Sequence, residues 1–534
     1  MKEEKIFESI EDIDEKYVAE ARKKDGKKQA VWVKWAAVAA CAVIVAAVVL
    51  GVNAIKKSGL IGPDISQSSS EPQESEQENT STSQASESEV SEQENTSTSQ
   101  ASESEVSEQE STVEKDPFKL TAVMAKYPDP VAPNMSKEEY YNSREFYDWS
   151  QLWSANIQKS REFQPGMSGY YENIMKQLLV SEDENTVCSP LNTYIAFAML
   201  AEVTDGSTRQ QILDMLEIPD IETLRNNVSA LWESNYADTP SIKSVLGNSL
   251  WLRNDFDYKP DTLSRLAENY YASSFSGAPG SEEMDQALQK WTDDNTCGLL
   301  KEYTDNMKTD PDMIMEIVST IYYKAQWDFI FDEEKTTREI FHGSLGDTTV
   351  DMMNQYCGIE GLYMTDKFAV WINRITEGGF MYFILPNEGV DVNELLSDPE
   401  VLDIIYDDDF RNEKWTLWDL YISVPKFKVS YKTDLTEALK ALGVTELFDA
   451  SADFSPLTEN AEGIYFSGAS HTAMIEIDED GITGAAYTEL EWGGGGGPVE
   501  EPEEYHFVLD RPFAFIVTSS DRSNLFSGVI RNID

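Results

Sequence analysis

The pattern of apolar and polar positions divides the chain into four stretches. Between Lys34 and Lys56 it reads WAAVAACAVIVAAVVLGVNAI, an unbroken apolar run. At about 1.5 Å rise per residue, a helix of this length crosses a hydrocarbon layer of ~30 Å. The next sixty residues are almost wholly polar, and apolar and aromatic positions return near Asp116. The pattern predicts an N-terminal segment (1–30), a transmembrane helix (31–55), a stalk (56–115) and a globular domain (116–534).

Basic residues set the orientation of the predicted helix. Several Lys and Arg residues precede the apolar run, whereas the chain turns acidic soon after Lys57. Positive charge stays inside the cell, so we expect a cytoplasmic segment 1–30 and a single-pass protein with its domain at the cell surface. A cleaved signal peptide is the alternative, because Val52-Asn53-Ala54 resembles a cleavage site, and the domain would then be secreted.

The stalk is a low-complexity repeat. The sequence SEQENTSTSQASESEV occurs at 75–90 and again at 91–106, and a third copy begins at Ser107. Such a segment has little apolar surface to offset the entropy of ordering, and its like charges repel. We expect a disordered linker that holds the domain away from the membrane or wall, with glycosylation of its hydroxyl groups as a weaker alternative.

The remainder mixes helical and strand-like patterns. The stretch PLNTYIAFAMLAE at 190–202 is helical, whereas MYFILP at 381–386 and LYISVPKFKVS at 420–430 are strand-like. An aromatic helical stripe at 140–153 is expected to pack on the domain. These patterns indicate one large α+β domain.

One segment near the C-terminus has a strand pattern in a loop setting. From Ile482 to Trp492 every second residue is apolar or small, and the alternate residues end in Glu489 and Glu491. Five glycines and an acidic, Pro-containing stretch follow. A period of two is typical of a strand with one buried face, whereas a glycine run is very mobile. The segment is therefore interpreted as a loop able to join a sheet; an ordinary edge hairpin is the alternative.

Charge excludes one class of partner. The formal net charge is −55, from 97 acidic and 42 basic residues, which repels nucleic acids and anionic lipid headgroups. We expect no nucleic-acid partner. The acidic surface either attracts cationic proteins or simply keeps the protein soluble.

Cysteine and histidine patterns give no sign of metal or hydrolytic chemistry. Four cysteines lack the spacing of zinc or redox sites, so we expect buried free thiols, no metal and no cofactor. There are three histidines, and no known hydrolase or nucleotide motif accompanies them. Ser470 and His471 are strand neighbours that point to opposite faces. The chain is thus expected not to be an enzyme, and His471 to sit in a buried hydrogen-bond network; a hydrolase built from scattered residues is the alternative.

Several motifs occur in the order typical of one family. They are CSPLNTYIAFAMLAEVTDGSTRQQIL from Cys188, NSLWLRNDF from Asn248, WTDDNTCGLL from Trp291, STIYYKAQWDFIF from Ser319, VPKFKV from Val424 and DRPFAFIV from Asp510. From about Gly166 to the C-terminus the chain resembles the serpin family, and its predicted anchor suggests a bacterial membrane-anchored type. The resemblance implies a large central mixed β-sheet, further sheets, about eight or nine helices and an exposed reactive-centre loop.

The resemblance also assigns roles to particular residues. The hinge of the loop would be Glu479, Asp480, Gly481, Ile482, Thr483, Gly484, Ala485 and Ala486. A shutter cluster would comprise Ser189, Asn192, Ser319 and His471, with Ser and Asn exchanged relative to the usual arrangement, and Trp327 would mark the breach at the top of the central sheet. The exchange keeps one hydroxyl and one amide, so we expect a hydrogen-bonded pair to survive. Counting the family's usual interval places the reactive bond at Gly495-Gly496.

The implied activity is suicide inhibition of an endopeptidase. A protease would cut the loop, and the freed Ile482–Trp492 segment would insert into the sheet. Small residues at the bond favour elastase-like serine or papain-like cysteine proteases as partners. We expect a monomer without catalytic residues. A non-inhibitory serpin that acts as a surface binding or scaffold protein, and a surface hydrolase, are the alternatives.

Overall fold

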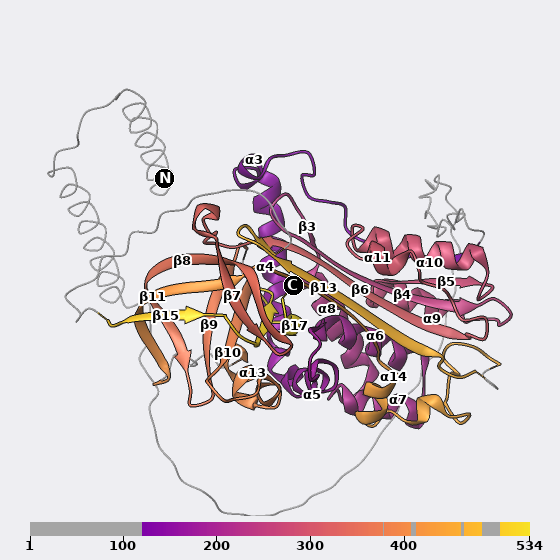
Figure 1. Cartoon of the computed structure of the whole chain (residues 1–534). Helices are drawn as coiled ribbons and strands as arrows, with labels where there is room; N and C mark the ends of the chain where they lie inside the picture. Colours follow the sequence, from indigo (N-terminus) through magenta and orange to yellow (C-terminus); the bar gives the residue numbers. More distant parts are fainter. Residues whose placement is uncertain (1–119, 378, 407–412, 461–463, 483–501, 534) are drawn as a thin grey trace, which may run out of the picture. The chain divides into compact units, whose positions relative to one another are not determined.

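The computed structural model describes residues 120–377, 379–406, 413–460, 464–482 and 502–533 (Figure 1). All of them belong to the unit Ser107–Asp534. The predicted transmembrane helix and the repeat stalk lie outside these residues. Within the described part of the chain, no helix combines the length and the hydropathy that a membrane crossing requires.

Helices occupy mainly the first half of the domain and lie on both faces of the eight-stranded sheet, with α10 and α6 on opposite faces (Figure 1). The α-helices are α3 (Lys137–Tyr141), α4 (Arg144–Arg161), α5 (Ser168–Leu179), α6 (Pro190–Val203), α7 (Gly206–Met215), α8 (Ile221–Asn235), α9 (Pro260–Asn269), α10 (Glu282–Asn295), α11 (Lys301–Thr304), α12 (Val392–Leu395), α13 (Pro399–Tyr406) and α14 (Thr436–Ala441). Several are single turns, which is why they exceed the eight or nine helices that the resemblance implied.

The strands form two mixed sheets. The eight-stranded sheet has the order β1 (Thr121–Val123), β5 (Ala272–Gly277), β4 (Lys243–Arg253), β6 (Met315–Gln326), β14 (Gly481–Ile482), β13 (Gly468–Ile477) and β12 (Phe427–Asp434), with β3 (Ala237–Asp238) paired to β4. The nine-stranded sheet has the order β15 (Glu504–Val508), β11 (Trp415–Pro425), β8 (Gly346–Met364), β9 (Phe368–Ile375), β10 (Gly379–Pro386), β16 (Phe513–Thr518), β17 (Asn524–Ile530) and β2 (Thr186–Cys188), with β7 (Thr337–Gly343) paired to β8.

The helix predicted at 190–202 is confirmed as α6, and its composition explains its central position. Ser189 caps it by accepting a hydrogen bond from the Asn192 N–H, and Pro190 takes the first helical position, where a missing N–H costs nothing. All 14 residues are buried. A helix that is apolar on every side belongs in a core, and α6 contacts strands of both sheets, β6 and β17.

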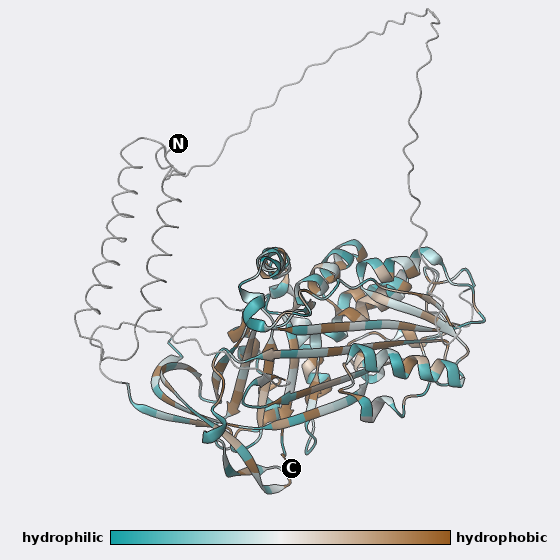
Figure 2. Ribbon diagram, turned by 90° about the horizontal axis from the view of Figure 1, so that it is seen from above, coloured by the Kyte–Doolittle hydropathy of each residue, from teal (hydrophilic) through white to brown (hydrophobic). Residues whose placement is uncertain are grey.

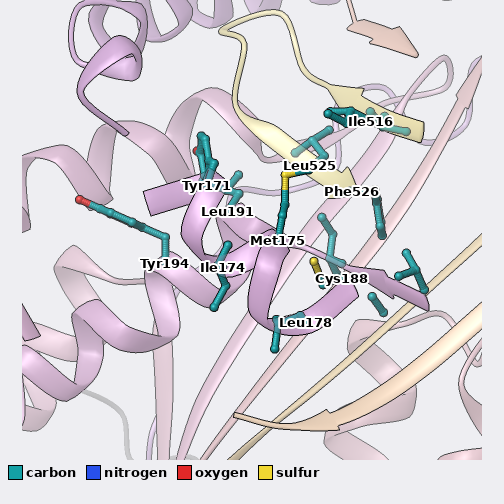
Figure 3. Packing of buried hydrophobic residues seen from close by; sticks show 14 of the residues in the cluster. Tyr171, Ile174, Met175, Leu178, Cys188, Leu191, Tyr194, Ile516, Leu525 and Phe526 are labelled. Carbon is teal, nitrogen blue, oxygen red and sulfur yellow. The ribbon is translucent and has the colours of Figure 1, made fainter. Parts of the chain in front are cut away.

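The main core joins the helices to the nine-stranded sheet. Figure 3 shows Met175 of α5 pointing toward Leu525 and Phe526 of β17. Its sulfur accepts hydrogen bonds from Ser527 Oγ at 3.5 Å and Asn524 Nδ2 at 3.6 Å. In Figure 2 the strands carry most of the hydrophobic colour, as the strand patterns at 381–386 and 420–430 predicted. Those two patterns are confirmed as β10 and as β11 with β12.

Two predictions about side chains need correction. The stripe at 140–153 packs only in part: Tyr140 is fully buried, but Tyr147 is 62% exposed because it lies on the outer face of α4. The thiols of Cys188, Cys297 and Cys357 are free, yet only Cys188 is buried. Cys297 is exposed and takes a left-handed conformation, with φ +51°, just after the end of α10.

Candidate functional site

Trp327 fixes the top of the eight-stranded sheet. It directly follows β6 and is 2% exposed. Its indole Nε1 donates to the Asp478 carbonyl at 3.0 Å, and its backbone N–H donates to the Asp480 carbonyl at 3.1 Å. A bridge to Ile375 connects it to β9 of the other sheet. The residue predicted at the breach therefore holds the chain that leaves β13, with both its side chain and its backbone.

The chain turns back after β13 and begins a new strand. Asp478 Oδ1 accepts hydrogen bonds from the backbone N–H groups of Asp480 at 3.0 Å and Gly481 at 3.1 Å, which closes a tight turn. Gly481 and Ile482 then form β14. This strand is antiparallel to both of its neighbours, with Ile482 opposite Ile477 on one side and Ala325 on the other. The first residues of the predicted loop are thus already part of the central sheet.

Close approach explains the glycine in this turn. A Cβ atom built on Gly481 would lie 2.3 Å from the Ala325 carbonyl oxygen and 2.7 Å from the Gln326 Cα. Both are backbone atoms of β6 and cannot move aside without breaking the sheet. Only glycine lets the returning chain pass this close to β6.

Glu479 anchors the turn by a buried carboxylate. It is 6% exposed and accepts hydrogen bonds from Thr336 Oγ1 at 2.7 Å and from Lys426 Nζ at 2.5 Å. Burial alone would raise the pKa of Glu479, but the bonds from Lys426 and Thr336 outweigh it and hold the pKa below its usual value. At neighbouring Asp480, burial together with the nearby carboxylates of Asp478 and Glu333 outweighs the attraction of Lys426 and raises the pKa.

The four predicted shutter residues meet beneath the middle of the sheet. The Ser189 N–H donates to His471 Nε2 at 2.9 Å, and Ser319 Oγ donates to the Asn192 carbonyl at 3.3 Å. His471 of β13 lies directly opposite Ser319 of β6 in the register of the two strands. The structure therefore brings together the residues that the resemblance grouped.

The expected pairing of hydroxyl and amide side chains in this cluster is wrong. Both polar atoms of the Asn192 side chain are buried without a hydrogen-bond partner among the described residues. The reason is local: the Ser189 hydroxyl is taken up in capping α6, and Ser319 reaches the Asn192 backbone carbonyl instead of its amide. Ser319 thus contacts the backbone of Asn192 and not its side chain.

Burial keeps His471 neutral. The residue is fully buried, and desolvation lowers its pKa to about 4. Because Nε2 accepts from Ser189, the ring proton sits on Nδ1, which has no partner within the described part of the chain.

This histidine predicts acid sensitivity. Its pKa falls from about 6.5 in the unfolded chain to about 4 in the fold. The stabilisation by neutral His471 is therefore complete above pH 6.5 and is lost as the pH falls toward 4, by about 2–3 kcal/mol at pH 4.5. Urea unfolding at pH 7.5 and 4.5 measures it. His471→Gln, which keeps an acceptor, should lose that much less stability between the two pH values; an equal loss in both proteins would contradict the assignment.

The rest of the predicted loop falls outside the described residues. Thr483, Gly484, Ala485, Ala486 and the bond Gly495-Gly496 belong to this group. The chain is described again from residue 502, and β15 pairs in parallel with β11. The sequence interpretation also missed three residues that hold the hinge, namely Thr336, Lys426 and Asp478. Lys426 stands in the VPKFKV motif, which was quoted for its strand pattern and not for its charge.

Comparisons with known proteins identify the family. The model for "Serpin (serine protease inhibitor)" matches residues 171–533. The chain is 28% identical over 373 residues to an alpha-1-antitrypsin-like protein of Tamias sibiricus, and the match covers 68% of this chain and 86% of that protein. It is 27% identical over 372 residues to alpha-1-antitrypsin of Sus scrofa, covering 68% and 84%. The chain belongs to the serpin family, whose members are generally serine protease inhibitors.

Solved structures agree on the fold. The native state of the thermophilic serpin tengpin superposes with a TM-score of 0.60 and 23% identity, covering 77% of this chain and 98% of that one. Human glycosylated kallistatin gives a TM-score of 0.60 at 23% identity, covering 70% and 99%. At these identities the likeness establishes the serpin fold.

The relatives' names correct one prediction and leave another open. The prediction that the chain is not an enzyme named no activity for it. The relatives are named as antitrypsins, an antiproteinase and a proteinase inhibitor, so the prediction is corrected to a relation with proteases. These relatives come from mammals, so the bacterial, membrane-anchored type is not shown.

Proposed function

We propose that this serpin is an extracellular, membrane-tethered suicide inhibitor of endopeptidases that works by cleavage and insertion of its reactive loop. The observation that carries the proposal is β14: Gly481 and Ile482 already occupy a slot between β6 and β13. Below this slot the two strands pair directly with each other over five positions, from Gly468 opposite Glu316 to Thr472 opposite Thr320. The sheet is open at the top and closed at the bottom.

Continuing β14 in its present register fits the proposed inserted strand. Ile482 faces Ala325, and the strands are antiparallel, so Trp492, ten residues further on, would face Met315, ten residues back. Met315 is the first residue of β6. On the other side Trp492 would face Ser467, next to the first residue of β13. The segment Ile482–Trp492, first recognised from its alternation, therefore has the length of the strands that would receive it.

The two faces of the segment also match their surroundings. Its apolar or small residues would share a face with alternate residues of β6 that are at most 4% exposed. All of these β6 residues except the shutter residue Ser319 line the main core; they are Met315, Ile317, Ser319, Ile321, Tyr323 and Ala325. Its other residues would lie on the opposite face. Ile482, now 1% exposed, is the first member of the inward set.

Insertion would separate the shutter pair. In the extended register Thr488 would stand between Ser319 and His471, which now face each other directly. A hydroxyl at this position can donate and accept hydrogen bonds in a cluster where His471 Nδ1 and the Asn192 amide have no partner within the described residues. The inserted strand would thus complete a polar cluster that the uncut chain leaves unsatisfied.

The proposed reaction uses the chemistry of the protease. Its nucleophile attacks the carbonyl carbon of the scissile bond, the new amino terminus leaves with the C-terminal fragment, and the loop remains joined to the protease as an acyl-enzyme. Insertion then gains ladder hydrogen bonds of about 1 kcal/mol each and buries apolar surface at about 25 cal/mol per Å². The inserting loop carries the attached protease with it before water can hydrolyse the acyl-enzyme.

The residues of the loop suggest the class of target protease and the bond that it cuts. Gly495-Gly496 is the proposed bond, and small residues there suit elastase-like serine or papain-like cysteine proteases. Leu490 or Trp492 as the attacked residue would instead suit chymotrypsin-like enzymes. Mass spectrometry of the C-terminal fragment produced by pancreatic elastase, papain and chymotrypsin locates the bond. A fragment that begins at Gly496 would support Gly495-Gly496, and cleavage at another bond, such as the one after Leu490 or Trp492, would reject it.

A gel assay tests the inhibitory function. The full-length chain, incubated with each of these three proteases, should give a complex that survives SDS and boiling and has the summed mass of the protease and of the chain up to the cut bond. Catalytically inactive protease is the control and should give none. Repeated turnover of the chain as a substrate, with no complex for any protease that cuts the loop, would reject inhibition. Cell fractionation of the producing organism tests the membrane tether separately.

A further inference from the structure

The residues before the family match form an arm that begins at the top of the domain in Figure 1 and runs down from there. We define the N-terminal arm as residues 127–165; it contains α3 and α4, and in Figure 1 α3 lies above β3. The arm packs on α8, with the rings of Tyr127 and Trp232 5.2 Å apart. Trp153 Nε1 donates to the Ser234 carbonyl at 2.8 Å, and Trp153 is 9% exposed. The arm is therefore an integral part of the fold.

The end of α4 is fastened to the nine-stranded sheet. Ser160 Oγ donates to Asp521 Oδ2 at 2.6 Å in the turn between β16 and β17. In the same turn Arg161 donates twice to the Ser520 carbonyl, from Nη2 at 2.6 Å and from Nε at 3.0 Å. Ser160 and Asp521 are both fully buried, so the bond between them is shielded from water. This end of the arm is fixed to a sheet that takes no part in loop insertion.

The other end of the arm reaches the slot that holds the hinge. Lys137 Nζ, in the first turn of α3, donates to Gln326 Oε1. Gln326 is the last residue of β6, and Gly481 of β14 lies directly opposite it. A capping box formed by Ser136 and Glu139 fixes the start of α3, so the position of Lys137 is defined by its helix.

A carboxylate near Lys137 attracts its ammonium group. Glu377, in the turn between β9 and β10, has a left-handed backbone with φ +67°, and its carbonyl accepts a hydrogen bond from Ser520 Oγ at 2.8 Å. Its carboxylate accepts a hydrogen bond from Ser241 Oγ and attracts the Lys137 ammonium. The adjacent Thr376 N–H donates to the Gln326 carbonyl at 2.8 Å. The last residue of β6 is thus tied to the second sheet by its backbone and to the arm by its side chain.

We propose that the N-terminal arm holds the top of β6 in the open position that keeps Ile482 seated, with Lys137 as the positioning residue. The proposal rests on the proposed function in one respect: a seated hinge is useful because it allows rapid insertion after cleavage. The direction of the effect follows from the geometry. The slot is one strand wide at Gln326 and closed below Thr320, so β6 and β13 would also pair at the top if β14 left. The bond from Lys137 stabilises the state in which they stay apart.

We call the contact of Lys137 with Gln326 the brace, and hydrogen exchange of the full-length chain tests it. Lys137→Met keeps the apolar stem of the side chain but removes the hydrogen-bond donor. We expect amide exchange in peptides covering 322–328 and 476–482 to rise by about threefold to tenfold, because one hydrogen bond at a half-buried site is lost. Lys137→Arg retains a donor and should restore slow exchange. Exchange in β17 should stay unchanged in all variants, which separates hinge release from general destabilisation.

A matched control uses another basic residue of the same arm. Arg144→Met removes a cation whose side chain is 86% exposed and, among the described residues, pairs with Asp148 one turn away, so hinge exchange should equal that of the unaltered chain. Unchanged hinge exchange in Lys137→Met, or an equal rise in Arg144→Met, would overturn the brace. If no covalent complex forms but Lys137→Met still raises hinge exchange, inhibition is rejected and the brace stands. If a covalent complex forms but Lys137→Met leaves hinge exchange unchanged, the brace is rejected and inhibition stands.

Discussion

Replacement of Ile482 by Glu should convert the inhibitor into a substrate. Ile482 is 1% exposed between Ile477 and Ala325, on the face that lines the main core. A carboxylate there would have to be buried without a partner, at a cost of several kcal/mol, both in the uncut chain and after insertion. The hinge escapes this cost only by leaving the sheet, and a hinge outside the sheet cannot lead the rest of the loop into it. We expect the covalent complex to drop at least about 100-fold relative to cleaved chain, measured by gel densitometry at fixed protease.

A conservative change separates insertion from the rate of cleavage. Ile482→Val removes one methylene group and should cost no more than about 1 kcal/mol, leaving the yield of complex near that of the unaltered chain. Cleavage of the loop itself should proceed at similar rates in all three proteins, because the proposed bond is remote in sequence from Ile482. Normal complex formation by Ile482→Glu would show that insertion does not require an apolar residue 482 seated in the sheet.

Replacement of Trp327 by Ala should destabilise the domain by about 3–5 kcal/mol, the usual cost of emptying a buried tryptophan site. The change also frees the Asp478 carbonyl, which now accepts from the indole at 3.0 Å. Trp327→Phe keeps an aromatic ring and loses only the donor and some volume, so it should cost about 1–2 kcal/mol. Urea unfolding at pH 7.5 measures both.

The two Trp327 variants separate ring packing from hydrogen bonding. A large loss in Ala with a small loss in Phe assigns the effect to ring packing at the top of the sheet. Equal losses would assign it to the hydrogen bond with the turn after β13. A negligible loss in both would contradict the role of Trp327 in holding the two sheets together. Tyr147→Ala, at a position 62% exposed, should change stability by less than about 0.5 kcal/mol.

The sequence predicted the fold because its signals were both local and ordered. The apolar α6 segment, the strand of β10 and the Ser-Pro helix start each depend on neighbours in the chain, and their order matches the serpin family. The alternation from Ile482 is also a local signal, but beyond Ile482 it stays a prediction because residues 483–492 lie outside the described part of the chain. These features follow from backbone periodicity, which a single sequence displays directly.

Contacts between distant residues could not be read in the same way. The bond between Lys426 and Glu479 joins two motifs that lie far apart in the chain, and Lys137 meets Gln326 across 189 positions. Nothing in a charge pattern says which of many lysines meets a buried partner. The Asn192 amide illustrates the opposite error, because equal numbers of donors and acceptors did not ensure that they face one another.

The stability of the cut chain tests loop insertion most directly. The full-length protein is cleaved once in the loop, within residues 490–498, and its thermal unfolding is compared with that of the intact protein. Roughly ten residues joining the sheet add about 10 kcal/mol of ladder hydrogen bonds, so the unfolding temperature should rise by about 10 °C or more. The Ile482→Glu variant should show a much smaller rise. An unfolding temperature that stays the same or falls after cleavage of the unaltered chain would contradict insertion.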